Sequence, residues 1–392
     1  MKLLSLTDIY PSKDTPFSGV FIRSLNKALS GHLEVTVVHP CPWPKSFSMH
    51  SSNASSYYER QGSIQVYRPP MFVPARGDRI FMRGFFFFLS TLKLLLITKK
   101  YTDFDLVHAH MAVPAGFAGV ILSRIFRKPI VITCHGSDLN VYPHIPVLKQ
   151  MVNYSLKRSD AIVTVSNNLK AKAKALGISD NKIKVIKNGV DHKIFRTVDK
   201  CTAKKQLGLE KERHIILYIG HLTKEKGLAY LLRSMASLLK IKRNVYLFII
   251  GEGKEKRRLS NMISTLGIEK RVFLIGPRPN SEIPIWLGAS DLLCLPSFRE
   301  GLPCVILEAL ACGRPVVASD IGGIPEVLGG DETLGIMISP KDDRALARAL
   351  TKALNAQWNA QHISSKMQEW SWENTAQQYL AVFESLFSVK EK

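Results

Sequence analysis

The segment F-R-E-G-L-P-C-V-I-L-E-A-L-A-C-G-R-P, residues 298–315, decides the fold class. It follows a buried apolar run that ends at Leu295, and Pro303 and Gly313 mark the two ends of a helix of about ten residues. Free N–H groups and the positive dipole end of that helix favour a phosphate or an electron-rich sugar oxygen. Strand, loop and helix together predict one repeating unit of a parallel α/β sheet.

Two carboxylates lie close to the predicted helix start. Glu300 is in the loop before it, and Glu308 lies about a turn and a half inside the helix. Two carboxylates would repel an anion, so we expect them to accept hydrogen bonds from hydroxyls, which sugars and riboses supply. The alternative is a solvated loop glutamate and a helix glutamate paired with a lysine.

The same alternation of short apolar runs and helix-length amphipathic stretches extends along the whole chain. It predicts an α/β fold of two doubly wound Rossmann-like domains facing across a cleft. The polar stretch from Arg196 to His214 separates two sets of strands, which places the domains at 1–199 and 200–370, with a C-terminal helix over 371–392 returning to the first domain. The predicted strands are 3–6, 35–38, 64–67, 105–108, 130–133, 161–165 and 183–186, then 215–219, 245–250, 272–275, 292–295, 316–318 and 336–338.

Composition places the chain among globular proteins, and its charge is the unusual feature. Of the 392 residues, 46% are hydrophobic and 22% charged, which excludes a disordered or membrane-embedded chain. The net charge is +22, with 28 basic and 12 acidic residues in 1–200 against 26 and 20 in 201–392. The first half is therefore expected to face an anionic partner such as a membrane surface, nucleic acid or phosphorylated substrate.

The cellular compartment follows from the cysteines and the apolar runs. The six cysteines form no C-x-x-C pair, which is typical of a reducing compartment. The longest apolar run, residues 85–97, contains Lys93 and is well short of the roughly 20 residues that span a bilayer. We expect a cytoplasmic protein that binds the inner face of the plasma membrane peripherally, if at all.

One amphipathic helix is predicted over residues 78–100. At 100° per residue its basic face contains Arg79, Arg83 and Lys93, with Phe86 and Phe87 beside it. Its core face contains Phe81, Phe85, Phe88, Leu92 and Leu96. Cations interleaved with aromatic residues suit a membrane interface. The alternative is a partly buried helix of an acceptor pocket in which the phenylalanines pack.

Three further motifs have residue types that suit phosphate or metal chemistry. G-H-L-T-K-E-K-G, residues 220–227, follows a strand and brings Lys226 within reach of a diphosphate, although a loop lysine is more often solvated. G-E-G at 251–253 lacks the third glycine of a dinucleotide fingerprint and predicts a tight turn. H-A-H at 108–110 puts His108 and His110 on one strand face without a third ligand, so we expect no metal site.

Several motifs together resemble one enzyme family. The E-x7-E string ending in E-A-L-A-C-G-R-P-V-V-A-S and the G-G-I-P-E-V at 322–327 are similar to the group 1 (family 4) retaining glycosyltransferases of the GT-B fold. The other similar motifs are G-H-L-T-K-E-K-G, V-S-N-N-L near Ser166 and K-N-G-V-D from Lys187 toward Phe195. These motifs occur in the family's order and cover nearly the whole chain.

The resemblance implies roles for residues of the second domain. Glu308 would hold the ribose hydroxyls of the donor nucleotide, and Glu300 would approach the donor sugar near its reacting carbon. Backbone around Gly301 and Leu302 would line the same pocket. Lys226 matches the lysine that neutralises the diphosphate.

Other positions depart from the family's pattern or rest on it alone. His221 stands where the family usually has arginine, so the positive charge that the arginine would offer to the diphosphate is missing at this position. Arg278 or Arg299 could compensate for it. Glu326 of G-G-I-P-E-V is assigned to donor binding. In the first domain, Gly19 would let backbone approach the donor phosphate, and His135 would contact the donor sugar.

The implied activity is a metal-independent, retaining transfer of a hexosyl group. The donor would be a nucleotide-sugar, with UDP or GDP as the leaving group, and no cofactor is required. The acceptor would be a saccharide or a lipid-linked hydroxyl in bacterial surface polysaccharide or glycolipid synthesis. The alternatives are a sugar-nucleotide epimerase or hydrolase on the same fold, and a non-catalytic nucleic-acid-binding protein. Because no base-reading motif occurs, we expect no nucleic acid partner.

Overall fold

The computed structural model describes residues 1–13, 15–43, 57–73, 80–98 and 103–388. The chain divides into two compact units. Unit 1 contains Met1–Asn188 and Trp372–Lys392, and unit 2 contains Gly189–Ser371. Each unit is built on its own parallel sheet, so the doubly wound α/β class predicted from the sequence is confirmed.

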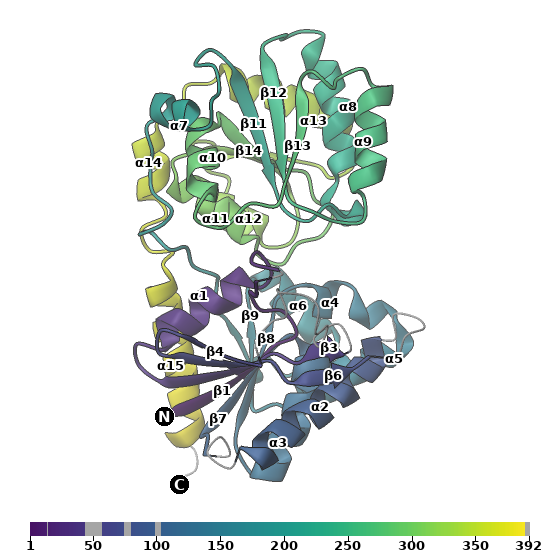
Figure 1. Ribbon diagram of the computed structural model, residues 1–392, viewed down its shortest axis with the longest axis vertical. Helices are drawn as coiled ribbons and strands as arrows, with labels where there is room; N and C mark the ends of the chain where they lie inside the picture. The colour runs from purple at the N-terminus through teal and green to yellow at the C-terminus, as the bar shows by residue number, and fades with distance from the viewer. Residues whose placement is uncertain (14, 44–56, 74–79, 99–102, 389–392) are drawn as a thin grey trace. The chain divides into compact units, whose positions relative to one another are not determined.

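Unit 1 is centred on an eight-stranded sheet (Figure 1). Its strands are β1 Lys2–Leu6, β2 Glu34–Val38, β4 Tyr58–Gln61, β5 Ile64–Tyr67, β7 Leu106–His110, β8 Ile130–Cys134, β9 Ala161–Thr164 and β10 Ile183–Val185. Their order is β10-β9-β8-β7-β1-β2-β5-β4, and only β4 runs antiparallel to its neighbour. A separate parallel pair is formed by β3 Cys41–Trp43 and β6 Pro70–Phe72.

The helices of unit 1 come from both ends of the chain. They are α1 Val20–Leu29, α2 Ile80–Ile97, α3 Phe117–Phe126, α4 Ser137–Asn140, α5 Pro146–Arg158, α6 Asn167–Ala175 and the C-terminal α15 Trp372–Ser388. Helix α15 lies beside α1 (Figure 1). Hydrogen bonds join it to the rest of the unit: Thr375 Oγ1 donates to the Lys187 carbonyl at 3.1 Å, the hydroxyls of Tyr379 and Thr133 lie 3.0 Å apart, and Gln377 Nε2 lies 3.2 Å from His32 Nε2.

Unit 2 is an all-parallel, six-stranded sheet in the order β13-β12-β11-β14-β15-β16. The strands are β11 His214–Ile219, β12 Val245–Ile250, β13 Val272–Gly276, β14 Leu292–Leu295, β15 Val316–Ser319 and β16 Gly335–Ile338. The helices are α7 Lys200–Gln206, α8 Leu228–Leu239, α9 Lys256–Thr265, α10 Ile283–Ala289, α11 Cys304–Ala311, α12 Ile324–Leu328, α13 Asp343–Asn355 and α14 Ala360–Ser365. Helix α8 packs against α9 and α13, and α10 packs against α7 (Figure 1).

Burial explains why the long strands were predictable and the short ones were not. Every residue of Val245–Ile250 is buried, as expected for a strand covered by helices on both faces. Every strand predicted from an apolar run is present. The edge strand Tyr58–Gln61 and the short pair β3 and β6 were missed, because polar or proline-containing segments of three or four residues have no such signal.

The predicted faces of the helix around residues 80–97 are partly wrong. Phe85 and Leu96, assigned to the core, are 52% and 61% exposed, whereas Phe87, assigned to the basic side, is fully buried. The buried side runs through Gly84, where an added Cβ would lie 2.9 Å from Met151 Cε. A glycine does not count as apolar in a periodicity analysis, so the packing side was missed.

The basic side of the same helix is also weaker than predicted. Arg79 lies outside the described residues. Arg83 is half-buried and lies near Asp8: burial raises the pKa of that carboxyl to about 6, and the Arg83 charge partly opposes the rise, so Arg83 is not a fully exposed surface cation. Lys93 is exposed as expected. Within the described residues, no helix has both the length and the hydropathy to cross a bilayer.

Candidate active site

Strand order locates the ligand-binding edge of unit 2. The neighbouring strands β11 and β14 lie where the order reverses, and in parallel sheets ligands bind beyond the carboxyl ends of the strands at such a point. The segment after β11 is G-H-L-T-K-E-K-G, and the segment after β14 contains Glu300. Two motifs that are distant in sequence therefore meet at one edge of the sheet.

Lys226 and Glu300 form an ion pair at this edge. The distance from Lys226 Nζ to Glu300 Oε1 is 2.7 Å. The side chains are only 22% and 8% exposed, so Lys226 is not the solvated loop lysine of the alternative interpretation. The pair puts a cation and a carboxylate together beside the sheet edge, as a site for a diphosphate and a sugar requires.

Glycine makes this approach possible. Gly227 has φ 71°, in the left-handed region, and a Cβ there would lie 1.9 Å from the Pro296 carbonyl oxygen. The Phe298 N–H donates to the Glu225 carbonyl at 2.7 Å, which joins the two loops directly. The backbone therefore sets the position of Lys226 relative to Glu300.

A third loop supports the first two from the end of β15. The Gly323 N–H donates to the Gly301 carbonyl at 2.7 Å, and Leu302 is buried beside it. Gly322 has φ 57°, and a Cβ there would lie 2.4 Å from the Glu300 carbonyl oxygen. Glu326, in the short helix that follows, is half-buried.

Glu308 lies on α11, eight residues after Glu300 in the sequence. Its carboxyl forms no hydrogen bond or ion pair with another described residue, and burial raises its pKa to about 7. A carboxyl that is half-buried and lacks a protein partner is suited to accept hydrogen bonds from a bound hydroxylated ligand.

His221 occupies the loop that leads to Lys226. Its carbonyl accepts a hydrogen bond from Tyr218 Oη at 2.9 Å. Partial burial and the nearby Lys226 charge lower the pKa of the imidazole, which keeps it neutral at pH 7. A neutral ring cannot supply the charge of an arginine. Of the two proposed substitutes, Arg278 lies 4.0 Å from Glu282, and Arg299 is exposed.

In unit 1, Gly19 is required by the protein's own backbone. It precedes α1 with φ 67°, and a Cβ there would lie 2.5 Å from the Ile9 carbonyl oxygen. Any larger residue would disturb the loop between β1 and α1. This requirement exists whether or not a donor phosphate also approaches the glycine.

His135 follows β8 at the carboxyl edge of the unit 1 sheet. Its Nε2 shares a hydrogen bond with His110 Nδ1 at 3.1 Å, and the two rings stack with centroids 5.4 Å apart. Burial lowers the pKa of His135 to about 3 and that of His110 well below its usual value. The buried Nδ1 of His135 has no partner among the described residues, so it can bind a ligand.

A second hydrogen-bonded group lies beside these rings in the core. The His108 ring lies 4.2 Å from that of His110, and its Nε2 shares a 2.8 Å hydrogen bond with the Thr133 hydroxyl, which in turn meets Tyr379. H-A-H was expected to matter only as a metal motif, so the contact of His110 with His135 was missed. The available signal was that both histidines stand at the ends of predicted strands, His110 after 105–108 and His135 after 130–133. No group of ligating side chains suited to a metal occurs in the described part of the chain.

The predicted site residues therefore fall into two groups. Unit 2 brings together Lys226, Glu300, Gly301 and Leu302, with His221, Glu308 and Glu326 on neighbouring segments of the same edge. Unit 1 contributes Gly19 and His135. The first group offers charge to a diphosphate and carboxylates to hydroxyls, and the second offers a neutral imidazole.

Two family models match the chain, one over each unit. The model described as "Glycosyltransferase Family 4" matches residues 18–194, and that described as "Glycosyl transferases group 1" matches residues 199–370. The chain is 32% identical over 371 residues to a protein of Bacillus subtilis (strain 168) whose assigned name is teichuronic acid biosynthesis glycosyltransferase TuaC. That similarity covers 90% of this chain and 89% of the relative.

Solved structures share the fold. Sucrose-phosphate synthase from Thermosynechococcus elongatus superposes with a TM-score of 0.84 at 21% identity, covering 99% of this chain and 100% of the other. HepE of Anabaena, solved in complex with UDP, has a TM-score of 0.74 at 22% identity, covering 98% and 100%. The chain belongs to the group 1, family 4 glycosyltransferases and is a nucleotide-sugar-dependent glycosyltransferase of the GT-B fold.

Proposed function

We propose that the chain is a retaining, metal-independent hexosyltransferase of bacterial surface polysaccharide or glycolipid synthesis. The observation that carries the proposal is the Lys226–Glu300 pair at the switch point of unit 2, with the unpartnered carboxyl of Glu308 on the following helix. A UDP- or GDP-sugar is the donor. Glu308 accepts hydrogen bonds from its ribose, and the backbone at Gly301 and Leu302, together with Glu326, lines the donor pocket.

Lys226 stabilises the leaving group. Before the donor binds, its ammonium is paired with Glu300 at 2.7 Å. When the diphosphate arrives, the ammonium faces an anion whose charge increases as the glycosidic bond breaks, so its stabilisation is greatest in the transition state. The carboxylate of Glu300 then lies beside the donor sugar, where it accepts hydrogen bonds from hydroxyls near the reacting carbon.

The proposed chemical step forms one bond and breaks one. The acceptor hydroxyl oxygen bonds to the anomeric carbon on the face from which the diphosphate departs, and the bond from that carbon to the phosphate oxygen breaks. The acceptor proton passes to the departing phosphate oxygen. No protein nucleophile is needed, because the nucleoside diphosphate is already a good leaving group.

His135 contributes without carrying charge. Burial keeps its ring neutral, so it can exchange hydrogen bonds with an uncharged sugar hydroxyl without repelling the positively charged sugar that forms in the transition state. The unpartnered Nδ1 is the atom suited to this contact. His221 approaches the diphosphate as a neutral hydrogen-bonding group.

An exposed apolar stripe on unit 1 supports a lipid-linked acceptor at the inner membrane face. On α2, Phe85, Leu89, Leu96 and Ile97 are 52%, 41%, 61% and 67% exposed, and Lys93 lies among them. These positions are spaced by three or four residues, so they share one side of the helix. Apolar side chains with a cation between them suit an anionic membrane surface. The relative from Bacillus subtilis is named for teichuronic acid biosynthesis, which supports a saccharide-containing acceptor.

A thermal-shift screen of UDP, GDP and their sugars tests the donor, followed by a transfer assay with and without acceptor lipid extract. We expect one nucleoside diphosphate to raise the melting temperature, and its sugar to be consumed only when acceptor is present. Consumption at the same rate without acceptor would identify a hydrolase or epimerase. A product of inverted anomeric configuration would exclude the retaining mechanism.

A further inference from the structure

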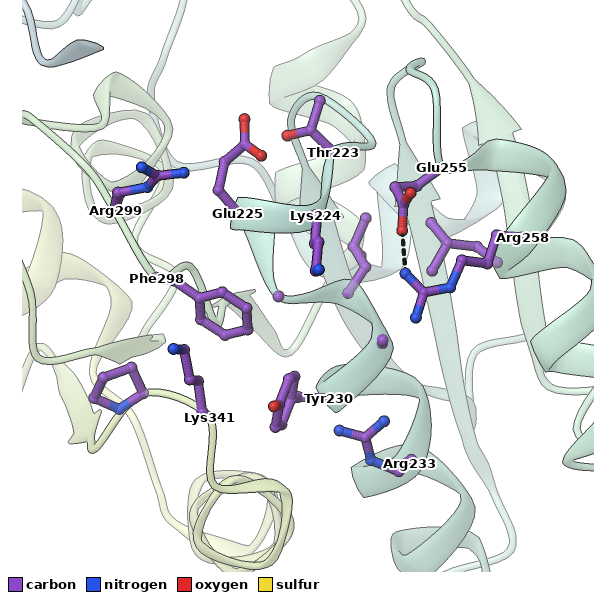
Figure 2. A pocket seen from close by; sticks show the side chains of 15 residues that line it. Thr223, Lys224, Glu225, Tyr230, Arg233, Glu255, Arg258, Phe298, Arg299 and Lys341 are labelled. Atoms are coloured by element: carbon purple, nitrogen blue, oxygen red, sulfur yellow. Dashed lines mark hydrogen bonds and ion pairs between the residues drawn. The ribbon is translucent and has the colours of Figure 1, made fainter. Parts of the chain in front are cut away.

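A pocket of unit 2 is bordered by the loops that carry Lys226 and Glu300, and Figure 2 shows the side chains that line it. Its volume is about 760 Å³, enough for a ligand of nucleotide size. The walls come from the first turn of α8, the start of α9, the loop after β14 and the loop between β16 and α13. The loops of two motifs discussed above border this pocket, but Lys226 and Glu300 themselves do not line it.

The pocket is separate from the groups assigned to the donor. Its walls include Lys224, Glu225 and Gly227 but not Lys226. They include Phe298 and Arg299 but not Glu300. Both loops therefore border the pocket, while the Lys226–Glu300 ion pair is not part of its walls.

Positive charge dominates the lining. Five cationic side chains and two carboxylates border the pocket. The cations are Lys224, Arg233, Arg258, Arg299 and Lys341, and the carboxylates are Glu225 and Glu255. Arg258 pairs with Glu255 at 2.7 Å, and Arg233 pairs with Asp343, which lies outside the lining, at 2.5 Å. In the described part of the chain, Lys224, Arg299 and Lys341 have no carboxylate oxygen within ion-pair distance.

Aromatic rings form one wall. Tyr230 and Phe298 meet edge to face at 5.2 Å, and Figure 2 shows Lys224, Arg233 and Arg258 around the space that these rings border. The Lys341 ammonium lies 5.5 Å from the Phe298 ring centre. Lys341 also has φ 64°, a conformation that costs about 1 kcal/mol or more for a residue other than glycine. The cation of Lys341 therefore lies at the pocket wall in a backbone conformation that glycine would adopt more easily.

We propose that this pocket binds a phosphorylated small molecule, separately from the donor. A phosphate group carries up to two negative charges at neutral pH and accepts several hydrogen bonds. A ligand with a phosphate group therefore suits a cluster of cations better than a ligand with a single carboxylate. The pocket also borders the first turn of α8, whose positive dipole end favours an anion. The aromatic wall offers a surface to a sugar or base ring attached to that phosphate.

Calorimetric titration with inorganic pyrophosphate tests the proposal on the full chain. Excess UDP occupies the donor groups, and a Lys226→Ala chain repeats the titration with those groups weakened, so the result does not depend on UDP binding. We expect pyrophosphate to bind one further site. Lys224→Ala and Lys341→Gly should each weaken that binding about tenfold, the effect of one charge-assisted contact.

Two features keep the result interpretable. Lys341→Gly relieves the strained φ, so it should not impair folding, and the melting temperature checks this. Arg257→Ala is the matched control, because Arg257 is exposed on the same α9 but does not line the pocket. Unchanged binding in this control supports a specific site. Equal weakening by Arg257→Ala, absence of a further site, or tighter binding of citrate than of pyrophosphate would overturn the proposal.

Discussion

Unit 1 and unit 2 place polar groups at the same part of a parallel sheet, but with opposite electrostatics. The unit 2 edge contains an ion pair, Lys226 and Glu300, that remains partly accessible to water. The unit 1 edge contains stacked imidazoles, His110 and His135, that burial keeps neutral. We propose that this difference corresponds to separate roles, in which unit 2 contacts the charged diphosphate and unit 1 contacts uncharged hydroxyls.

Removing the ammonium group of Lys226 should have the largest effect on turnover. Lys226→Ala is expected to lower turnover by about 10²–10³, because the charge that it faces grows during the reaction. Steady-state kinetics with the identified donor measures this. Lys240→Ala, at the exposed C-terminal end of α8 and outside the ion pair, is the control for a general loss of charge. A rise in KM at constant turnover would instead mean that Lys226 binds substrate and transition state equally.

Removing the charge of Glu308 should weaken nucleotide binding by unit 2. Glu308→Gln should weaken UDP binding by about 1.5–3 kcal/mol, because neutral amide oxygen replaces a charged acceptor. Since burial raises the carboxyl pKa to about 7, wild-type affinity should fall as pH drops from 8 to 6, whereas the variant should be flat. Calorimetry at several pH values is the measurement. Equal affinity and slope in both proteins would remove Glu308 from the donor site.

The ionised carboxyl of Glu308 should lower the free energy of unfolding when no ligand is bound. Its folded pKa, about 7, exceeds the ordinary value of 4.5, so the folded state binds the proton more tightly. Its contribution is therefore fully present below pH 4.5 and lost as pH rises through 7. Glu308→Gln should stabilise the ligand-free protein at pH 8 by on the order of 2 kcal/mol. Denaturant unfolding at pH 5 and pH 8 tests this, and an equal effect at both would contradict it.

In unit 1 the expected effects are smaller, because the groups are neutral. His110 is a positioning residue that holds the His135 ring through the 3.1 Å hydrogen bond. His110→Phe should lower turnover about tenfold with little change in UDP affinity, since one neutral hydrogen bond is lost. His110→Asn should recover part of the activity, because an amide can replace the hydrogen bond. Equal loss in both variants would mean that His110 only fills space.

The two edges also differ in how far the sequence predicted them. Buried parallel strands and the loops after them follow from apolar runs, so Lys226 and Glu300 could be expected near one sheet edge. Their pairing depends on Gly227 and Gly322 allowing close backbone approach, which spacing alone does not reveal. The link between His110 and His135 depends on the register of β7 against β8, where His110 pairs with Thr133. Such register is a property of the assembled sheet.

Helix α2 shows the limit of periodicity most clearly. An almost wholly apolar segment has no polar side to define its orientation, so tertiary contacts chose the buried side. Gly84 allows α2 to pack closely against Phe117 and Met151. In this packing Phe87 is buried and Phe85 is exposed. The support for membrane binding is therefore the exposed apolar stripe of α2, and not the predicted basic face.

That stripe provides the smallest expected effect and a last contrast between the units. Phe85→Ser with Lys93→Glu should weaken binding to vesicles with anionic lipid several-fold, because each cation near such a surface contributes about 1 kcal/mol and an exposed aromatic ring adds apolar contact. Ile241→Ser is the matched control, since Ile241 is 78% exposed but belongs to unit 2. Salt at 1 M shortens the Debye length to about 3 Å and should release the electrostatic part. Cosedimentation measures binding, while UDP affinity should stay constant in all variants. Equal sedimentation of wild type and double variant would assign the stripe to another role and leave unit 1 without a membrane-binding surface.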